Sequence, residues 1–181
     1  MDKNELRGRM KAVGAVDPDV GAKVVDGLRS WLGARLPGTI SAYLAMAIEV
    51  DVATLFDQLP GWNWVLPRVE DDKSLTFRDR DVPREVHPFG MTQPAELGVI
   101  TPFNQIDVFL VPGLAFDRAG RRLGKGGGFY DGVLSNKRAD AVAIGVTTES
   151  RLVDEVPVED HDVPVGWLAT ELGVMECAPR R

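Results

Sequence analysis

The apolar residues of the chain recur at spacings that predict helices in some segments and buried strands in others. A shorter helix is predicted over Glu5–Val13, where Gly14 and then Asp17-Pro18 interrupt the pattern. Asp17 or Asp19 is expected to cap a longer helix that stops before Pro37-Gly38. Apolar residues three or four positions apart form its core-facing stripe: Val20, Val24, Leu28, Trp31, Leu32 and Leu36.

Two apolar runs, Ile106–Val111 and Ala141–Val146, have the nearly continuous pattern of strands buried on both faces. Further strands are predicted over Thr39–Met46, Trp64–Val69, Ser74–Arg78 and Val165–Thr170, and further helices over Val52–Leu59 and Phe129–Lys137. Residues 70–73 are expected to form a hairpin turn, and the polar, proline-rich stretch Asp79–Phe103 an irregular binding loop. This alternation predicts a three-layer α/β/α sandwich with a mostly parallel, Rossmann-like sheet, in a single domain spanning residues 1–181.

Composition narrows the classes of function. The net charge of −6 gives no support to a nucleic-acid or anionic-membrane surface. The only cysteine, Cys177, cannot form an internal disulfide, and no apolar run reaches the roughly 20 residues of a membrane span. The N-terminus is charged from its second residue and does not resemble a signal peptide. We therefore expect a cytoplasmic protein without a nucleic-acid or membrane partner. A monomer is also expected.

The glycine-rich segment Gly120–Gly128 is the strongest candidate for chemistry, because it follows a predicted buried strand and precedes a helix. Its backbone N–H groups could converge on an anion at the helix N-terminus, with Arg121, Arg122 and Lys125 matching phosphate charge. The spacing is not that of a Walker A loop, and Phe129 fills the last glycine position of a G-x-G-x-x-G motif. On composition alone, a glycine-rich turn without a ligand stays open.

The same segment, together with several others, resembles one enzyme family. Val-Pro-Gly-Leu-Ala-Phe-Asp, followed by Arg-Leu-Gly-Lys-Gly-Gly-Gly-Phe-Tyr-Asp, is similar to the signature of 5-formyltetrahydrofolate cyclo-ligases (methenyltetrahydrofolate synthetases). The resemblance covers nearly the whole chain and continues, in the family's order, through Lys3–Arg7, Tyr43–Asp51, Leu66–Arg68, Phe89–Pro94 and Val156–Pro164. Only the glycine segment would support the resemblance alone.

The resemblance implies that MgATP drives closure of 5-formyltetrahydrofolate to 5,10-methenyltetrahydrofolate. The formyl oxygen attacks the γ-phosphate to give an N5-iminium phosphate, N10 then attacks that carbon, and phosphate leaves. Lys3, Arg122 and Lys125 are the implied catalytic residues, and Asp131 and Asp162 the implied magnesium ligands. The implied ATP-binding residues are Lys3, Arg7, Arg122, Leu123, Gly124, Lys125, Gly126, Gly127, Gly128, Phe129 and Tyr130.

For the folate substrate, the resemblance implies contacts from Leu44, Glu49, Phe89 and Tyr130. The carboxylate of Glu49 would accept hydrogen bonds from the pterin N3–H and 2-amino group. We assign no catalytic role to His161, which lies among acidic residues in a loop.

The chain departs from the family pattern at Phe129, where a tyrosine is usual, and at Gly132, where many members carry a larger residue. The region between Arg7 and Asp17 is also shorter and less basic. Two alternatives stay open: a non-catalytic nucleotide- or folate-binding paralogue, and a phosphate-binding isomerase or CoA-transferase-like enzyme on a related scaffold.

Overall fold

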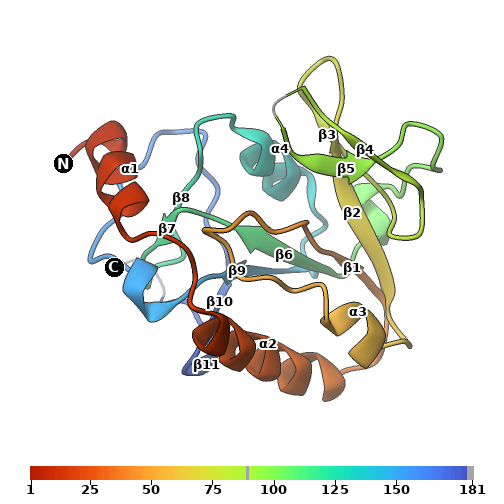
Figure 1. Ribbon diagram of the computed structural model, residues 1–181, viewed down its shortest axis with the longest axis horizontal. Coiled ribbons are helices and arrows are strands. Elements are labelled where there is room, and N and C mark those ends of the chain that lie inside the picture. The colour runs from red at the N-terminus through yellow and green to blue at the C-terminus, as the bar shows by residue number, and fades with distance from the viewer. Residues whose placement is uncertain (89, 179–181) are drawn as a thin grey trace.

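The computed structural model describes residues 1–88 and 90–178 (Figure 1). In chain order the elements are α1 (Lys3–Ala12), α2 (Pro18–Gly33), β1 (Thr39–Ser41), α3 (Leu55–Gln58), β2 (Asn63–Val69), β3 (Leu75–Asp79), β4 (Arg84–Val86), β5 (Thr92–Pro94), η1 (Phe103–Gln105), β6 (Val108–Pro112), β7 (Ala115–Phe116), β8 (Arg122–Leu123), α4 (Phe129–Asn136), β9 (Val142–Val146), η2 (Glu149–Arg151), β10 (Trp167–Thr170) and β11 (Gly173–Glu176).

A seven-stranded sheet, in the order β11-β10-β9-β6-β1-β2-β3, forms the centre of the protein. The strands β10, β9, β6, β1 and β2 run parallel, whereas the edge strands β11 and β3 are antiparallel to their neighbours. The expectation of a mostly parallel sheet is therefore confirmed. Counted along the chain, the parallel strands follow the doubly wound order 2-1-3-4-5, which reverses direction between β1 and β6.

Helices cover both faces of this sheet, with α2 and α3 on one side and α4 on the other (Figure 1). Adjacent residues of β6 show the two layers directly. Leu110 packs with Leu28 of α2 on one face, and Phe109 packs with Val133 of α4 on the other. The continuous apolar run of β6 is explained by this burial on both faces.

The first helix lies outside these layers and packs on the small β7–β8 hairpin through Leu6 and Met10. Asp2 caps its N-terminus in a reciprocal capping box with Glu5. At the other end, the buried guanidinium of Arg151 donates hydrogen bonds to the carbonyl oxygens of Met10, Gly14 and Leu114. Carbonyls at a helix C-terminus lack partners within the helix, so a cation there stabilises them. α1 is thereby held at its C-terminal end.

Several predicted boundaries are wrong. The strand predicted over Thr39–Met46 ends at Ser41, because the following apolar residues turn away to line a cleft. The helix predicted over Val52–Leu59 is only the single turn of α3. Leu36 lies beyond α2 and is 92% exposed, so it is not part of the core stripe.

The stretch predicted to be irregular, residues 79–103, contains the β4–β5 hairpin, and the strand β11 was not predicted. No described helix is long and apolar enough to cross a membrane.

Candidate active site

A cleft of about 910 Å³ opens at the carboxyl ends of β1, β2 and β6. Leu44 follows β1, Val69 ends β2, and Gly113 follows β6, and all three line it. This is the position beside the reversal of strand order at which open α/β sheets bind ligands. The cleft brings together residues from both halves of the chain, from Lys3 to Asp162.

The glycine segment forms one wall of the cleft through Gly124 and Gly126–Gly128. Gly126 has φ of 108° and Gly128, the N-cap of α4, has φ of 67°, conformations that favour glycine. A Cβ on Gly127 would stand 2.5 Å from Cε2 of Phe129. Within the described structure, the backbone N–H groups of Gly126–Gly128 donate no hydrogen bond. They are therefore available to an anion at the start of α4.

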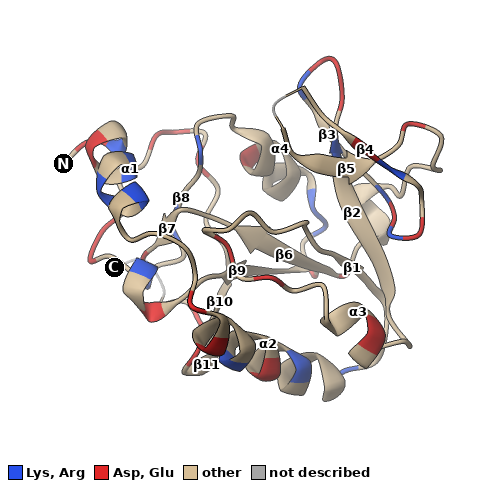
Figure 2. Ribbon diagram, in the orientation of Figure 1, with Lys and Arg blue, Asp and Glu red and all other residues tan. Residues whose placement is uncertain are grey.

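Three cations of the cleft each pair with a carboxylate. Lys3 Nζ lies 2.6 Å from Asp162 Oδ2 and 3.4 Å from Glu159 Oε1. Nη2 of Arg122 lies 3.1 Å from Asp131 Oδ2, and Lys125 Nζ lies 2.5 Å from Glu49 Oε1. Figure 2 shows that α1, which carries Lys3, also bears further basic residues. The positive charges of Lys3, Arg122 and Lys125 are thus each neutralised by a carboxylate of the cleft.

Arg7 and Arg122 both lie against the glycine segment. The Nε of Arg7 donates a hydrogen bond to the carbonyl oxygen of Gly124, at 3.0 Å, and so ties α1 to the segment. The side chain of Arg122 is only 7% exposed, and its buried Nε has no hydrogen-bond partner in the described structure. A buried N–H without a partner is costly, and an anion in the cleft would satisfy it.

The carboxylate of Glu49 also lines the cleft, where it pairs with Lys125 of the glycine segment. Its side chain is 6% exposed, and Oε2 accepts the N–H of Met46 at 2.9 Å. Two tyrosines lie close by. Burial, and then the negative charge of Glu49, raises the pKa of Tyr43 and of Tyr130. Both hydroxyls therefore stay protonated at neutral pH; that of Tyr43 donates to the carbonyl oxygen of Val50.

The two expected magnesium ligands both line the cleft. Asp131 Oδ1 accepts the N–H of Val163 at 3.4 Å, and Asp162 Oδ2 accepts the N–H of Glu159 at 2.7 Å. Burial opposes ionisation of Asp162, but its hydrogen bonds from Lys3 and Glu159 lower the pKa overall. In the described part of the chain, no three His, Cys, Asp or Glu side chains gather as a metal site. Hard carboxylate oxygens without a full protein cage suit an ion shared with phosphate oxygens, as Mg²⁺ commonly is.

Three residues considered from the sequence behave differently from the rest. Leu123 is fully buried in the cluster beneath α1 and does not line the cleft, so its side chain cannot contact a nucleotide there. Phe89 lies outside the described residues. His161 lies at the cleft, largely exposed, with Nε2 3.5 Å from Glu159 Oε2.

The opposite side of the cleft is here named the β2–β5 wall, and none of its residues was predicted as a site residue from the sequence. It consists of Pro67, Val69, Met91, Thr92 and Gln93. Two motifs of the family resemblance contribute to this wall, Leu66–Arg68 and Phe89–Pro94, but only Phe89 was predicted to contact a ligand. The wall faces the charged glycine segment with largely apolar side chains, which suits a flat aromatic ligand.

Comparison with known proteins agrees with this geometry. The model of the 5-formyltetrahydrofolate cyclo-ligase family matches residues 3–171. The chain belongs to this family. A 5-formyltetrahydrofolate cyclo-ligase of Mycolicibacterium smegmatis is 34% identical over 163 residues, which cover 80% of each chain. A mouse protein of the same name is 31% identical over 141 residues, 70% of each chain.

Solved structures show the same fold. A 5,10-methenyltetrahydrofolate synthetase of Aquifex aeolicus superposes with a TM-score of 0.84 at 28% identity, covering 100% of this chain and 95% of that one. One from Mycoplasma pneumoniae gives 0.79 at 25% identity, covering 94% and 99%. The cyclo-ligase family and its α/β fold, expected from the sequence, are thereby confirmed.

Proposed function

We propose that this chain converts 5-formyltetrahydrofolate and ATP to 5,10-methenyltetrahydrofolate, ADP and phosphate. The observation that carries the proposal is one cleft lined by Gly126–Gly128, whose N–H groups have no partner in the described structure, by the β2–β5 wall, and by Glu49, which pairs with Lys125. One side suits a triphosphate and the other a pterin. Family membership supports the same reaction.

The cations of the cleft would act on the phosphates of ATP. The formyl oxygen is a very poor leaving group, and its attack on the γ-phosphate converts it into a phosphate ester that can leave when N10 attacks. Lys3, Arg122 and Lys125 would neutralise the charge that moves during this transfer, while Arg7 holds the glycine segment. Positioning and charge neutralisation are the main contributions of proteins to phosphoryl transfer.

Magnesium, when bound, would neutralise phosphate charge and fix the geometry of the triphosphate. Asp131 and Asp162 would hold it, because both are carboxylates at the phosphate side of the cleft. Each now pairs with a cation, Arg122 or Lys3. On binding of MgATP, the cations would turn to the phosphates and the carboxylates to the metal, so that opposite charges stay paired throughout.

Glu49 would orient the pterin by accepting hydrogen bonds from its N3–H and 2-amino group. The protonated hydroxyl of Tyr130 and the side chain of Leu44 lie at the same cleft. Phe89 would contribute an aromatic contact.

The test is formation of the methenyl product, followed by its absorbance, with purified protein, 5-formyltetrahydrofolate and MgATP. Wild-type protein should turn over, and Asp131→Asn should lower turnover by about 100-fold or more. Asp140→Asn, an exposed aspartate paired with Arg138, is the matched control and should keep full activity.

Folate binding without product would contradict the proposal and indicate a non-catalytic paralogue. Phosphate-ester binding with no change in melting temperature on adding MgATP would indicate the isomerase-like alternative.

A further inference from the structure

The β2–β5 wall depends on side chains that lie behind it. β4 and β5 form a two-stranded hairpin that is not part of the central sheet. Met91, Thr92 and Gln93, on or beside β5, nevertheless supply three of the five residues of the β2–β5 wall. Their position therefore depends on whatever holds this hairpin against β2.

One link is made along the backbone of β2. Glu70 donates its N–H to Ser74 on the β3 side, so the N–H of Val69 points to the opposite edge of the strand. β1 pairs with β2 only as far as Val65 and cannot satisfy this donor. The side chain of Gln93 does so instead, with Oε1 accepting the N–H of Val69 at 3.1 Å.

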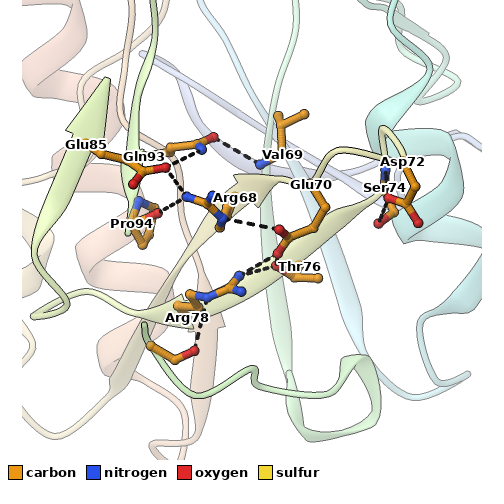
Figure 3. Close-up of polar contacts among 11 residues, drawn as sticks. Arg68, Val69, Glu70, Asp72, Ser74, Thr76, Arg78, Glu85, Gln93 and Pro94 are labelled. Carbon is orange, nitrogen blue, oxygen red and sulfur yellow. Dashed lines mark hydrogen bonds and ion pairs between the residues drawn. The ribbon is translucent and has the colours of Figure 1, made fainter. Parts of the chain in front are cut away.

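Arg68 supplies the central link, shown in Figure 3. Its Nη1 donates to the carboxylate of Glu85 on β4 and, at 2.9 Å, to the carbonyl oxygen of Pro94 on β5. Its Nε donates to Oε2 of Glu70 at 3.2 Å. The side chain is 12% exposed and does not line the cleft. A single guanidinium thus joins β2 to both strands of the hairpin.

The partners of Arg68 are themselves fixed. Glu85 also accepts Nε2 of Gln93 at 3.3 Å, so the two links meet at one carboxylate. The other oxygen of Glu70 accepts from Thr76 and, at 2.8 Å, from Arg78. Burial opposes ionisation of Glu70, but these bonds lower its pKa overall, and the carboxylate remains charged. The buried Arg78 in turn binds the carbonyl oxygen of Gly98, which follows the hairpin.

We infer that Arg68, together with Glu85, is a positioning residue for the folate substrate. It holds the β4–β5 hairpin against β2 so that Met91, Thr92 and Gln93 stand at the distance that the pterin and its attached ring require. The inference rests on the proposed function. It places specificity for folate in two charged residues, Arg68 and Glu85, neither of which lines the cleft. ATP binding, on the opposite side, does not depend on them.

The test compares Michaelis constants for the two substrates. Arg68→Met should raise KM for 5-formyltetrahydrofolate by about 10-fold or more, since small displacements of positioning groups have large effects. KM for ATP should stay within about 2-fold of the wild-type value, because Arg68 contacts neither Lys3 nor the glycine segment. Arg68→Lys keeps the charge but cannot bond in the same three directions, and it should give an intermediate value.

Glu85→Gln tests the same link from its half-exposed end and is the safer variant for folding. It should raise KM for the folate by a smaller factor, and Arg68→Met combined with Glu85→Gln should be no worse than Arg68→Met alone. Arg84→Met, on the same strand and exposed, is the matched control and should leave both constants unchanged.

The outcomes separate the inference from the proposed function. If wild-type protein forms no methenyl product, the proposed function fails. If it does, and the variants lower only kcat, or raise both Michaelis constants equally, Arg68 and Glu85 merely stabilise the fold and the inference is wrong. If Arg68→Met does not fold, an unchanged folate KM in Glu85→Gln overturns the inference, and a selective rise supports it.

Discussion

The two sides of the cleft are held in place by different means. On the phosphate side, formed by α1, the glycine segment, Asp131 and Asp162, the side chains expected to touch the ligands hold one another, as in the pairs Lys3–Asp162 and Arg122–Asp131. The β2–β5 wall is held mainly by Arg68, Glu70 and Glu85, which do not line the cleft. Under the proposed function, ligand binding would break contacts on the phosphate side and leave those of the wall intact.

The largest effect should come from distorting the phosphate side. Gly126→Ala places a side chain at φ of 108°, a conformation that costs about 1–3 kcal/mol. The segment should relax away from its present path, and kcat/KM for ATP should fall by about 100-fold. Steady-state kinetics with varied ATP would measure this.

Gly132→Ala is the matched control within the same region. A Cβ there meets nothing within 4 Å, and the residue lies inside α4. This variant should raise the free energy of unfolding by about 0.5–1 kcal/mol while turnover stays unchanged. Equal losses of activity in both glycine variants would show that the loss in Gly126→Ala does not come from backbone strain at that position.

A smaller effect is expected where the two sides meet, at the pair Lys125–Glu49. Lys125→Met frees Glu49 before any ligand arrives. Since Lys125 is 45% exposed, solvent weakens the pair, and the gain should be modest. The dissociation constant of 5-formyltetrahydrofolate without nucleotide should fall about two- to five-fold in calorimetric titration.

Lys11→Met, at an exposed lysine of α1, is the control and should bind the folate with the wild-type dissociation constant. Weaker folate binding in Lys125→Met would show that the lysine assists the folate instead of competing with it.

The smallest effect is expected for the pH dependence of the free energy of unfolding. Asp162 on the phosphate side and Glu70 behind the wall both have lowered pKa values in the folded state. Their stabilisation is complete above the unfolded values, near 3.8 and 4.5, and is lost as pH falls through the lower folded values. Urea unfolding from pH 7 to pH 3 would measure the free energy of unfolding of wild type, Asp162→Asn and Glu70→Gln. Each variant should differ from wild type at neutral pH, and this difference should shrink only at acidic pH. A difference that stays constant over this range would exclude a charged role for the carboxylate.

Local patterns predicted the parts of the fold that depend on short-range physics. The stripe of α2 and the double-sided burial of β6 follow from periodicity, and both were confirmed. The end of β1 could not be predicted, because Tyr43 and Leu44 continue the apolar run beyond the strand, where they pack against the core and also line the cleft. The β4–β5 hairpin lacks an apolar pattern, since β4 is exposed and is held by the ion pair of Glu85 with Arg68, which lies 17 positions earlier in the chain.

The same limit applies to the candidate site. Glycine content singled out residues 120–128 from the sequence alone, and Gly126 and Gly128 adopt positive φ, which favours glycine. Glu49 and Lys3 came only from the resemblance, because a lone acid after a strand and a lone lysine in a helix have no distinctive pattern. Lys3 meets Asp162, which lies 159 positions away in the chain, and Glu49 meets Lys125.

The attachment of α1 has a consequence for biosynthesis. The helix that carries Lys3 is secured by Arg151 at one end and Asp162 at the other, both supplied late in translation. A nascent chain that has emerged only as far as β9 already contains the β7–β8 hairpin and Gly124, which contact α1, but it lacks the two residues that fix the ends of this helix. The two ends of α1 are therefore fixed only after the carboxyl-terminal segments have left the ribosome.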